Sequence, residues 1–288
     1  MSRIYLLDMS GIAHWLYHAG NKEAIDDTGE FCGMLNGWRQ WIFEFLDRYD
    51  PSHIAAVYDG ANNWRKNPAN GGSLEYKAQR PPVDKELSLQ LRILPKETTG
   101  IGIRKLRYDT FEADDVIATL VSTHASEETP IIIVSSDKDL AQLIGDNVSM
   151  FDPRPKKDGQ THLYNAVRAT EKWGVPPHRM AELLALIGDA SDNVPGVKGW
   201  GKVRAVNAIN QTRSWSELVR KARSGQLEKI NPDLQASLIA QLSTYADCHR
   251  LVSLRYDVPI VETIDDLQWK HPAEVNNEIS SFHRSSKP

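Results

Sequence analysis

Three short apolar runs in the first half of the chain each lead to an aspartate, and this pattern limits the possible folds more than any other feature. The runs cover residues 4–7, 53–58 and 130–134, and the aspartates that follow them include Asp8, Asp59 and Asp137. Near-continuous apolar runs of this length are typical of parallel strands buried on both faces of a sheet. The pattern therefore predicts a parallel sheet with carboxylates at its strand ends.

Helical patterns separate these runs. Apolar residues recur at intervals of three and four over residues 29–49 and 112–124, which predicts amphipathic helices. Strands that alternate with helices indicate an α/β fold with a doubly wound, mostly parallel sheet, whose ligand crevice lies at the carboxyl ends of the strands. We expect this domain to cover residues 1–165.

The second part of the chain is expected to be helical over residues 166–288. Its helical patterns cover residues 178–187, 201–209, 215–222 and 233–253. The tail, from residue 263 to residue 288, is polar and weakly patterned, and we identify no interaction motif in it.

Composition restricts the setting of the protein. The chain has 288 residues and no apolar run of 18 residues, so no transmembrane helix is expected. Cys32 and Cys248 lack the spacing of a disulfide framework or a zinc site, which favours a reducing, cytoplasmic setting. The net charge of −4 argues against a nucleic-acid binder on bulk charge alone, but acidic residues gathered in one pocket can offset a separate basic face.

Residues 61–95 break the alternation of strands and helices. They contain Asn, Gly and Pro clusters, and their basic residues include Arg65, Lys66, Lys77 and Arg80. An insertion of this length is usually functional or mobile. We expect Lys77 and Arg80, three residues apart, to share a helix face that attracts a phosphate, and Tyr76 to stack on a base.

Nine carboxylates are expected to face the crevice. They are Asp8, Asp59, Glu112, Asp114, Asp115, Asp137, Asp139, Asp189 and Asp192. Each one alone fits an ordinary turn or helix cap. Together they would repel one another by about 1–4 kcal/mol per close pair, and divalent cations would remove that repulsion. Oxygen ligands without His or Cys suit Mg²⁺ or Mn²⁺, and a set large enough for two ions indicates two-metal hydrolysis of a phosphodiester.

The loop GVKGWGKV, residues 196–203, is one residue short of a nucleotide-binding P-loop, because Val203 stands where that motif has Ser or Thr. No predicted strand leads into it either. Its glycines would still let backbone N–H groups approach a phosphate, beside the N-terminus of a helix that begins near Gly201. We therefore expect a phosphate-binding loop whose ligand is not a nucleotide.

Six segments in series resemble the 5′-nuclease family, which includes flap endonucleases, phage 5′-exonucleases and the 5′-nuclease domain of bacterial DNA polymerase I. The segments are LLDMSG, VYDG, EYKAQRPP, FEADDVIATL, SSDKDLAQL and GDASDNVPGVKGWG. The resemblance covers about residues 3–260 and is greatest to the polymerase I domain, here expected as a stand-alone chain or an excised domain. It implies a PIN-like sheet, a helical arch over about residues 61–97, and a helix–three-turn–helix motif over about residues 183–210.

The resemblance also implies the activity and the roles of the site residues. It implies a Mg²⁺- or Mn²⁺-dependent 5′-3′ exonuclease and 5′-flap endonuclease that acts on branched, nicked or 5′-ended DNA. The family's first metal group matches Asp8, Asp59, Glu112 and Asp114, with Asp115 beside them. The second metal group matches Asp137, Asp139, Asp189 and Asp192. Lys77 and Arg80 match arch residues that contact the scissile phosphate, and Arg65 of the same insertion is a further candidate contact to DNA.

In the family the glycine loop contacts duplex DNA and holds a K⁺ ion. The resemblance implies both the contact and the ion for this chain. The matching positions are Gly196, Gly199, Gly201, Lys202 and Arg204. Two departures stand out, because Trp200 replaces a small aliphatic residue and Val203 replaces a frequent Lys. Phosphate contacts of this kind position a duplex without reading its sequence.

Other functions share parts of this pattern. A PIN-type ribonuclease has the acidic sheet edge but needs neither an arch nor a helix–three-turn–helix motif. A dehalogenase-like phosphatase needs a second Asp two residues after Asp8, where Ser10 stands. A binder of branched DNA without catalysis would tolerate lost carboxylates, and none of the nine is missing. The complete set favours an active nuclease.

Overall fold

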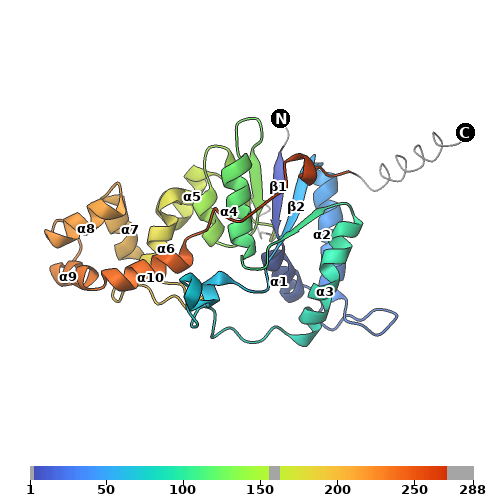
Figure 1. Ribbon diagram of the computed structural model, residues 1–288, viewed down its shortest axis with the longest axis horizontal. Helices are drawn as coiled ribbons and strands as arrows, with labels where there is room; N and C mark the ends of the chain where they lie inside the picture. Colours follow the sequence, from blue (N-terminus) through green and yellow to red (C-terminus); the bar gives the residue numbers. More distant parts are fainter. Residues whose placement is uncertain (1–2, 156–162, 271–288) are drawn as a thin grey trace, which may run out of the picture.

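A six-stranded sheet forms the N-terminal part of the computed structural model, which describes residues 3–155 and 163–270 (Figure 1). The strand order is β3-β2-β1-β4-β5-β6. The strands are β1 (Ile4–Asp8), β2 (His53–Tyr58), β3 (Arg104–Arg107), β4 (Ile131–Val134), β5 (Val148–Phe151) and β6 (Leu163–Tyr164). All neighbours are parallel except β6, which pairs antiparallel with β5. The doubly wound, mostly parallel sheet is confirmed.

Sequence patterning finds β1, β2 and β4 but misses the other strands. β3 lies at one edge of the sheet, and only Leu106 of its four residues is buried, so it forms no apolar run. β5 alternates buried and half-buried residues over only four positions, and β6 has two residues. The missed strands are those in which burial on both faces does not impose a continuous apolar run.

Helices cover both faces of the sheet. On β1, Leu7 faces a core that includes Trp38 from α2, whereas Leu6 faces a second core that includes Val116 from α4. The first face carries α1 (Met9–Ala19), α2 (Gly33–Tyr49) and α3 (Lys85–Gly100), and the second carries α4 (Ala113–His124) (Figure 1). α1 was not predicted, and α2 and α4 begin at Gly33 and Ala113 rather than at residues 29 and 112.

The second core continues into the C-terminal helices. These are α5 (Ala166–Trp173), α6 (Met180–Ile187), α7 (Lys202–Asn210), α8 (Trp215–Arg223), α9 (Pro232–Ala240) and α10 (Leu242–Val252). The single helix expected over residues 233–253 is instead two helices that meet at Gln241. Figure 1 shows α7, α8 and α9 at the end of the molecule away from α1 and α2.

The expected arch segment is mostly irregular. It contains two single-turn 3₁₀ helices, η1 (Trp64–Lys66) and η2 (Pro68–Asn70), and the chain then runs as a loop to α3 (Figure 1). The helix face predicted for Lys77 and Arg80 is wrong: residues 74–79 form turns, and Lys77 has a φ of +56°. The irregular stretch also ends earlier than residue 95, because α3 runs from Lys85 through Pro95 to Gly100.

No helix among the described residues is long and apolar enough to cross a membrane. Cys32 and Cys248 are both buried free thiols, so the expectation that they form no disulfide is confirmed. The predicted tail lies outside the described residues from residue 271 onward.

Candidate active site

The first group of carboxylates lies where β1, β2 and α4 meet. Asp8 ends β1 and caps α1, accepting hydrogen bonds from the Gly11 amide at 3.1 Å and from Ser135 Oγ at 2.7 Å. Asp59 follows β2 and accepts a hydrogen bond from the amide of Ala113, the first residue of α4, at 2.8 Å. These bonds fix the ends of two strands and the start of a helix around one point.

Electrostatics show that these side chains share one site. Burial, with the nearby charges of Asp59 and Asp137, raises the pKa of Asp8 to about 6, although hydrogen bonds from Ser135 and Gly11 lower it. Burial also raises the pKa of Asp114 well above its usual value, with Asp137, Asp8 and Glu112 adding to the effect. Packed carboxylates without cations repel one another, and each disfavours the ionised form of its neighbours. The arrangement is typical of a site whose ionised form needs positive charge.

The second group is Asp139, Asp189 and Asp192, which offer carboxylate oxygens within 4.8 Å of one another. Asp139 Oδ1 is buried without a hydrogen-bond partner, and its nearest cation is the Lys138 ammonium at 3.8 Å. Burial raises the pKa of Asp139, and Asp137 raises it further. Asp137 therefore acts on both groups, and eight of the nine predicted carboxylates form one continuous acidic cluster.

The irregular segment after β2 is held against this cluster by its cations. Lys77 Nζ forms an ion pair with Glu112 and lies 3.6 Å from Asp192 Oδ2. Arg80 pairs with Asp192 Oδ1 at 2.5 Å. Burial alone would lower the pKa of Lys77, but the two carboxylates raise it above its usual value. Both predicted phosphate-binding cations thus reach the acidic cluster.

Tyr76 has a different place from the one predicted. Its side chain is buried, and its hydroxyl donates to Asp192 Oδ2 at 2.8 Å and lies 3.1 Å from Glu112 Oε2. A ring in this position has no open face for a base to stack on. The structure makes Tyr76 a bridge between a carboxylate of the first group and one of the second.

Arg65 and Asp115 form a buried ion pair instead of contacting ligands. Arg65 is 2% exposed, pairs with Asp115 Oδ1 at 2.7 Å and with Glu112 Oε2 at 2.9 Å, and donates to the Leu251 and Ser253 carbonyls at the end of α10. The Asp115 carboxylate also accepts hydrogen bonds from the Trp64 indole and the Arg255 amide. A buried guanidinium cannot meet a DNA phosphate, and a carboxylate with four donors has little capacity left for a metal.

We predict that Arg65→Leu destabilises the fold by about 3–5 kcal/mol, because it leaves the buried Asp115 charge without its partner. Urea unfolding monitored by circular dichroism measures this. Arg39→Leu is the matched control, since the Arg39–Glu97 pair lies partly exposed at the surface and surface pairs contribute about 0–1 kcal/mol. Adding Asp115→Leu to Arg65→Leu should recover part of the loss. A stability change for Arg65→Leu no larger than that of the control would contradict the assignment.

The glycine loop lies in the segment that joins α6 to α7, within the range predicted for a helix–three-turn–helix motif. Gly196 has a φ of +69°, and a Cβ there would lie 2.4 Å from the Gly188 nitrogen, so glycine is needed for the loop to close on itself. Trp200 is buried and fills the C-terminal core, which accounts for the large residue at that position. Lys202 and Arg204 are exposed in the first turn of α7, and Arg204 also donates to the Gly199 carbonyl at 2.9 Å.

Val203 stands 84% exposed in the first turn of α7, where a lysine side chain would extend into solvent without displacing any core residue. We predict that Val203→Lys tightens duplex binding at low salt and steepens the dependence of log K on log salt by about one unit, as one added phosphate contact would. Fluorescence anisotropy of a labelled nicked duplex over a salt series measures both. Val167→Lys, on α5 and 65% exposed, adds the same charge elsewhere. Equal gains in the two variants would argue against a contact at position 203.

Sequence reasoning missed two features of the site. Lys138 pairs with Asp189 at 2.6 Å, a role that its place between Asp137 and Asp139 could have indicated. His14 and His18 project from α1 into a cleft of about 720 Å³ that Lys77 and Arg80 also line. No sequence signal pointed to the histidines, because α1 itself was not predicted.

Family models match both parts of the chain. Residues 3–174 match the 5′-3′ exonuclease N-terminal resolvase-like domain, and residues 175–275 match the 5′-3′ exonuclease C-terminal SAM fold. DNA polymerase I of Treponema pallidum is 32% identical over 267 residues, which are 91% of this chain and 26% of that protein. The chain thus spans about a quarter of the length of the polymerase relatives. A 5′-3′ exonuclease of Aquifex aeolicus is 27% identical over 279 residues, covering 94% of this chain and 88% of that protein.

Solved structures share the fold. T5 5′-exonuclease with bound zinc ions has a TM-score of 0.66 and 21% identity, over 87% of this chain and 89% of that one. A bacteriophage T5 flap endonuclease in complex with DNA and metal ions has a TM-score of 0.63 and 19% identity, over 87% and 88%. Since the two family models together cover residues 3–275, and the resemblance read from six sequence motifs agrees with them, the chain belongs to the 5′-3′ exonuclease family.

Proposed function

We propose that the chain is a divalent-metal-dependent, structure-selective 5′-nuclease that hydrolyses phosphodiester bonds in branched, nicked or 5′-ended DNA inside the cell. The observation that carries the proposal is the continuous acidic cluster, with the cations of Lys77 and Arg80 held against it. The relative named as a 5′-3′ exonuclease, and the neighbour solved with DNA and metal ions, support it.

The donor set fits two hard cations. The second group has three carboxylates within 4.8 Å and an Asp139 oxygen without a hydrogen bond, and a cation would satisfy that oxygen. The first group would consist of Asp8, Asp59, Glu112 and Asp114, with Asp137 between the groups. Oxygen-only ligands favour Mg²⁺ or Mn²⁺. When bound, two such ions supply Lewis-acid stabilisation of the phosphodiester in the transition state and activate the attacking water.

The chain's own cations would bind and orient the substrate. Lys77 and Arg80 now neutralise Glu112 and Asp192. If these carboxylates held cations, Lys77 and Arg80 would be free to donate charge-assisted hydrogen bonds to the scissile phosphate. Tyr76, bonded to both carboxylates, would hold the two ligand groups at a fixed separation.

The glycine loop would hold the duplex beside the cleavage point. The N-terminus of α7 and the exposed Lys202 provide a site for a backbone phosphate. We include Gly196, Gly199 and Gly201 as loop positions and Arg204 as a second cation in this contact. The carbonyls of the same loop are the proposed ligands of a K⁺ ion.

Cleavage of a fluorescent 5′-flap duplex tests the proposal. We expect cleavage with Mg²⁺ or Mn²⁺ and none with EDTA. A PIN-type ribonuclease would instead cut single-stranded RNA, and a non-catalytic binder would retain the flap intact. No cleavage of any branched DNA at saturating metal would overturn the proposal.

A further inference from the structure

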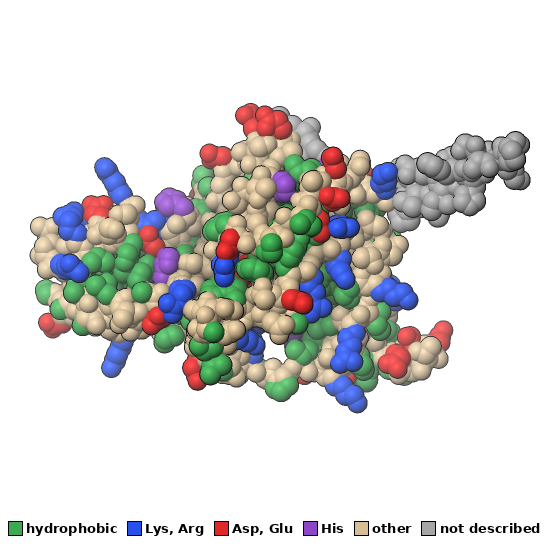
Figure 2. Space-filling model, viewed as in Figure 1, with side chains coloured by type: hydrophobic (Ala, Val, Ile, Leu, Met, Phe, Trp, Pro, Cys, Tyr) green, Lys and Arg blue, Asp and Glu red, His purple; other side chains and the backbone are tan. Residues whose placement is uncertain are grey.

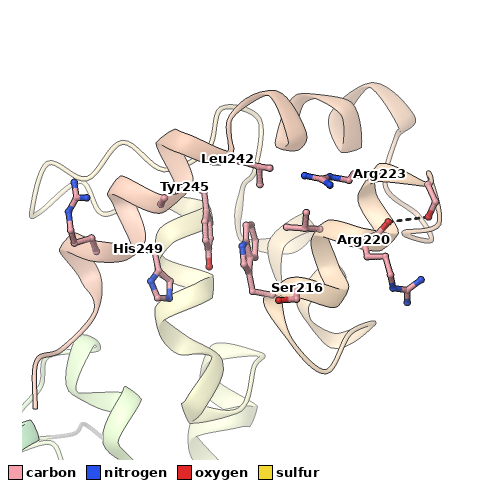
Figure 3. Close-up of a pocket in the computed structure, with 11 residues that line it drawn as sticks. Ser216, Arg220, Arg223, Leu242, Tyr245 and His249 are labelled. Atoms are coloured by element: carbon pink, nitrogen blue, oxygen red, sulfur yellow. Dashed lines mark hydrogen bonds between the residues drawn. The ribbon is translucent and has the colours of Figure 1, made fainter.

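A groove of about 830 Å³ lies between α8 and α10, in the C-terminal helices (Figure 3). Its size is that of a ligand pocket. Figure 2 shows hydrophobic side chains gathered over this end of the molecule, with Lys, Arg and His and some Asp and Glu side chains around them. The groove shares no lining residue with the acidic cluster or with the glycine loop, so the proposed nuclease site does not account for it.

Two rows of side chains form the walls of the groove. Trp215 and Val219 lie one turn apart on α8, and Leu242 and Tyr245 lie three residues apart on α10. The Trp215 and Tyr245 rings stack with centroids 3.4 Å apart and planes within 8°, which closes the floor of the groove. Trp215, Val219 and Leu242 remain only half-buried, so apolar surface stays open along both helices.

The charged side chains that line the groove are all basic, and the acidic residues near it lie outside the lining. Its lining includes three arginines and a histidine but neither Asp nor Glu, although the whole chain has a net charge of −4. Figure 3 shows Arg223 extending toward Leu242 across the groove, and the described residues include no carboxylate paired with it. Arg220 pairs with the half-buried Glu217 at 3.6 Å and Arg250 with the exposed Asp247 at 2.7 Å, each within its own helix. Surface pairs of this kind contribute little and exchange readily.

We propose that this groove binds an acidic amphipathic helix of a partner protein. The walls extend over residues 242–250 of α10, about 12 Å at the rise of an α-helix, which matches two turns of a bound helix. Apolar side chains at i, i+3, i+4 and i+7 would fill the space above the stacked rings, and flanking carboxylates would meet Arg223 and Arg250.

The same features favour a peptide over a nucleic acid. A DNA strand carries a phosphate at every nucleotide and is bound by cations along its path, and its bases stack on open aromatic faces. Here one face of Trp215 is already covered by Tyr245, and the remaining wall includes the aliphatic side chains of Val219 and Leu242. Aliphatic surface of this kind gains most from burying Leu or Phe.

Fluorescence anisotropy with synthetic probes tests the proposal. The probe is a fluorescein-labelled dodecapeptide with Leu and Phe at i, i+3, i+4 and i+7 and Glu on its other faces. We expect saturable binding that weakens about tenfold or more in Val219→Glu and in Arg223→Glu, a loss of about 1.4 kcal/mol. Arg213→Glu, an exposed position outside the groove, makes the same charge change and should bind as the parent chain does. Melting curves confirm that each variant is folded.

A second peptide of opposite charge tests whether Arg223 acts through its charge. A peptide with Lys in place of Glu should bind Arg223→Glu better than it binds the parent chain. Three results would overturn the proposal: no saturable binding of the acidic peptide, equal weakening in Arg213→Glu, or tighter, Arg223-dependent binding of fluorescein-labelled oligo(dT), which would assign the groove to nucleic acid. Flap cleavage by Arg223→Glu should stay unchanged, so failure of this proposal leaves the proposed nuclease activity untouched.

Discussion

Replacing Asp137 by alanine should abolish cleavage of a 5′-flap duplex while leaving the affinity for that duplex intact. Asp137 is the carboxylate that acts on both groups of the cluster, since it raises the pKa of Asp8 and of Asp114 in the first group and of Asp139 in the second. Without Asp137, both proposed ion sites lose the negative charge of a neighbouring carboxylate at once. Metal ions contribute several kcal/mol to transition-state stabilisation, so we expect a loss of about a thousandfold or more, at 1.36 kcal/mol per factor of ten.

Binding should survive because the duplex is proposed to be held at the glycine loop, away from Asp137. Single-turnover cleavage with Mg²⁺ and anisotropy with Ca²⁺ separate the two quantities. Asp146→Ala, in an exposed turn after η3 (Asp139–Leu143), is the matched control and should cleave normally. Equal loss of binding and cleavage in Asp137→Ala would remove the residue from its assigned catalytic role.

Lys77→Ala should slow the chemical step by about a hundredfold while changing duplex affinity little. Lys77 Nζ pairs with Glu112 of the first group and lies 3.6 Å from Asp192 of the second, so one ammonium contacts both groups. A scissile phosphate bound at the acidic cluster would receive this donor as its charge develops, and removing one such donor costs about 2.7–4 kcal/mol. An interaction made only in the transition state lowers the rate without weakening binding.

Single-turnover rates at saturating enzyme measure the chemical step directly. Lys77→Arg should recover part of the rate, because it keeps a cation at the same place. Lys85→Ala, at the exposed start of α3, should cleave at the parent rate. A Lys77→Ala variant that retains full single-turnover cleavage would show that the ammonium serves only to neutralise Glu112.

Lys77, Arg80 and Lys138 also neutralise part of the charge of the acidic cluster. All three pair with carboxylates of the proposed metal groups, at Glu112, Asp192 and Asp189. Cations from the chain thus compensate part of the negative charge that the fold concentrates there. Backbone contacts reinforce the arrangement, since the Lys77 amide donates to the Asp192 carbonyl at 2.9 Å. In the proposed mechanism, cations held by these carboxylates would therefore compete with the side chains of Lys77, Arg80 and Lys138.

The strand-end carboxylates were predictable because their signal is local. Asp8 and Asp59 follow apolar runs, and parallel strands bring their carboxyl ends to one edge whatever the connections between them. Glu112 and Asp114 were predictable for a similar reason, since they stand at the start of an amphipathic helix that local apolar spacing reveals. The missed elements lack such a signal: α1 follows β1 without a turn, and β3 has one buried residue.

The sequence by itself determined the fold class, the family and most of the acidic cluster, because periodicity and motif order are properties of neighbouring residues. Only the tertiary structure decided which of two similar residues lies at the site and which is buried elsewhere in the fold. Arg65 and Arg80 are both basic residues of one insertion. Arg65 is buried against Asp115 and against the Leu251 carbonyl of α10, which is 186 residues along the chain. Arg80 instead reaches Asp192 at the site. Asp114 and Asp115 are adjacent, but a helix turns about 100° per residue, so one faces the cluster and the other a buried arginine. Such outcomes depend on which distant segment packs alongside, and no local pattern records that.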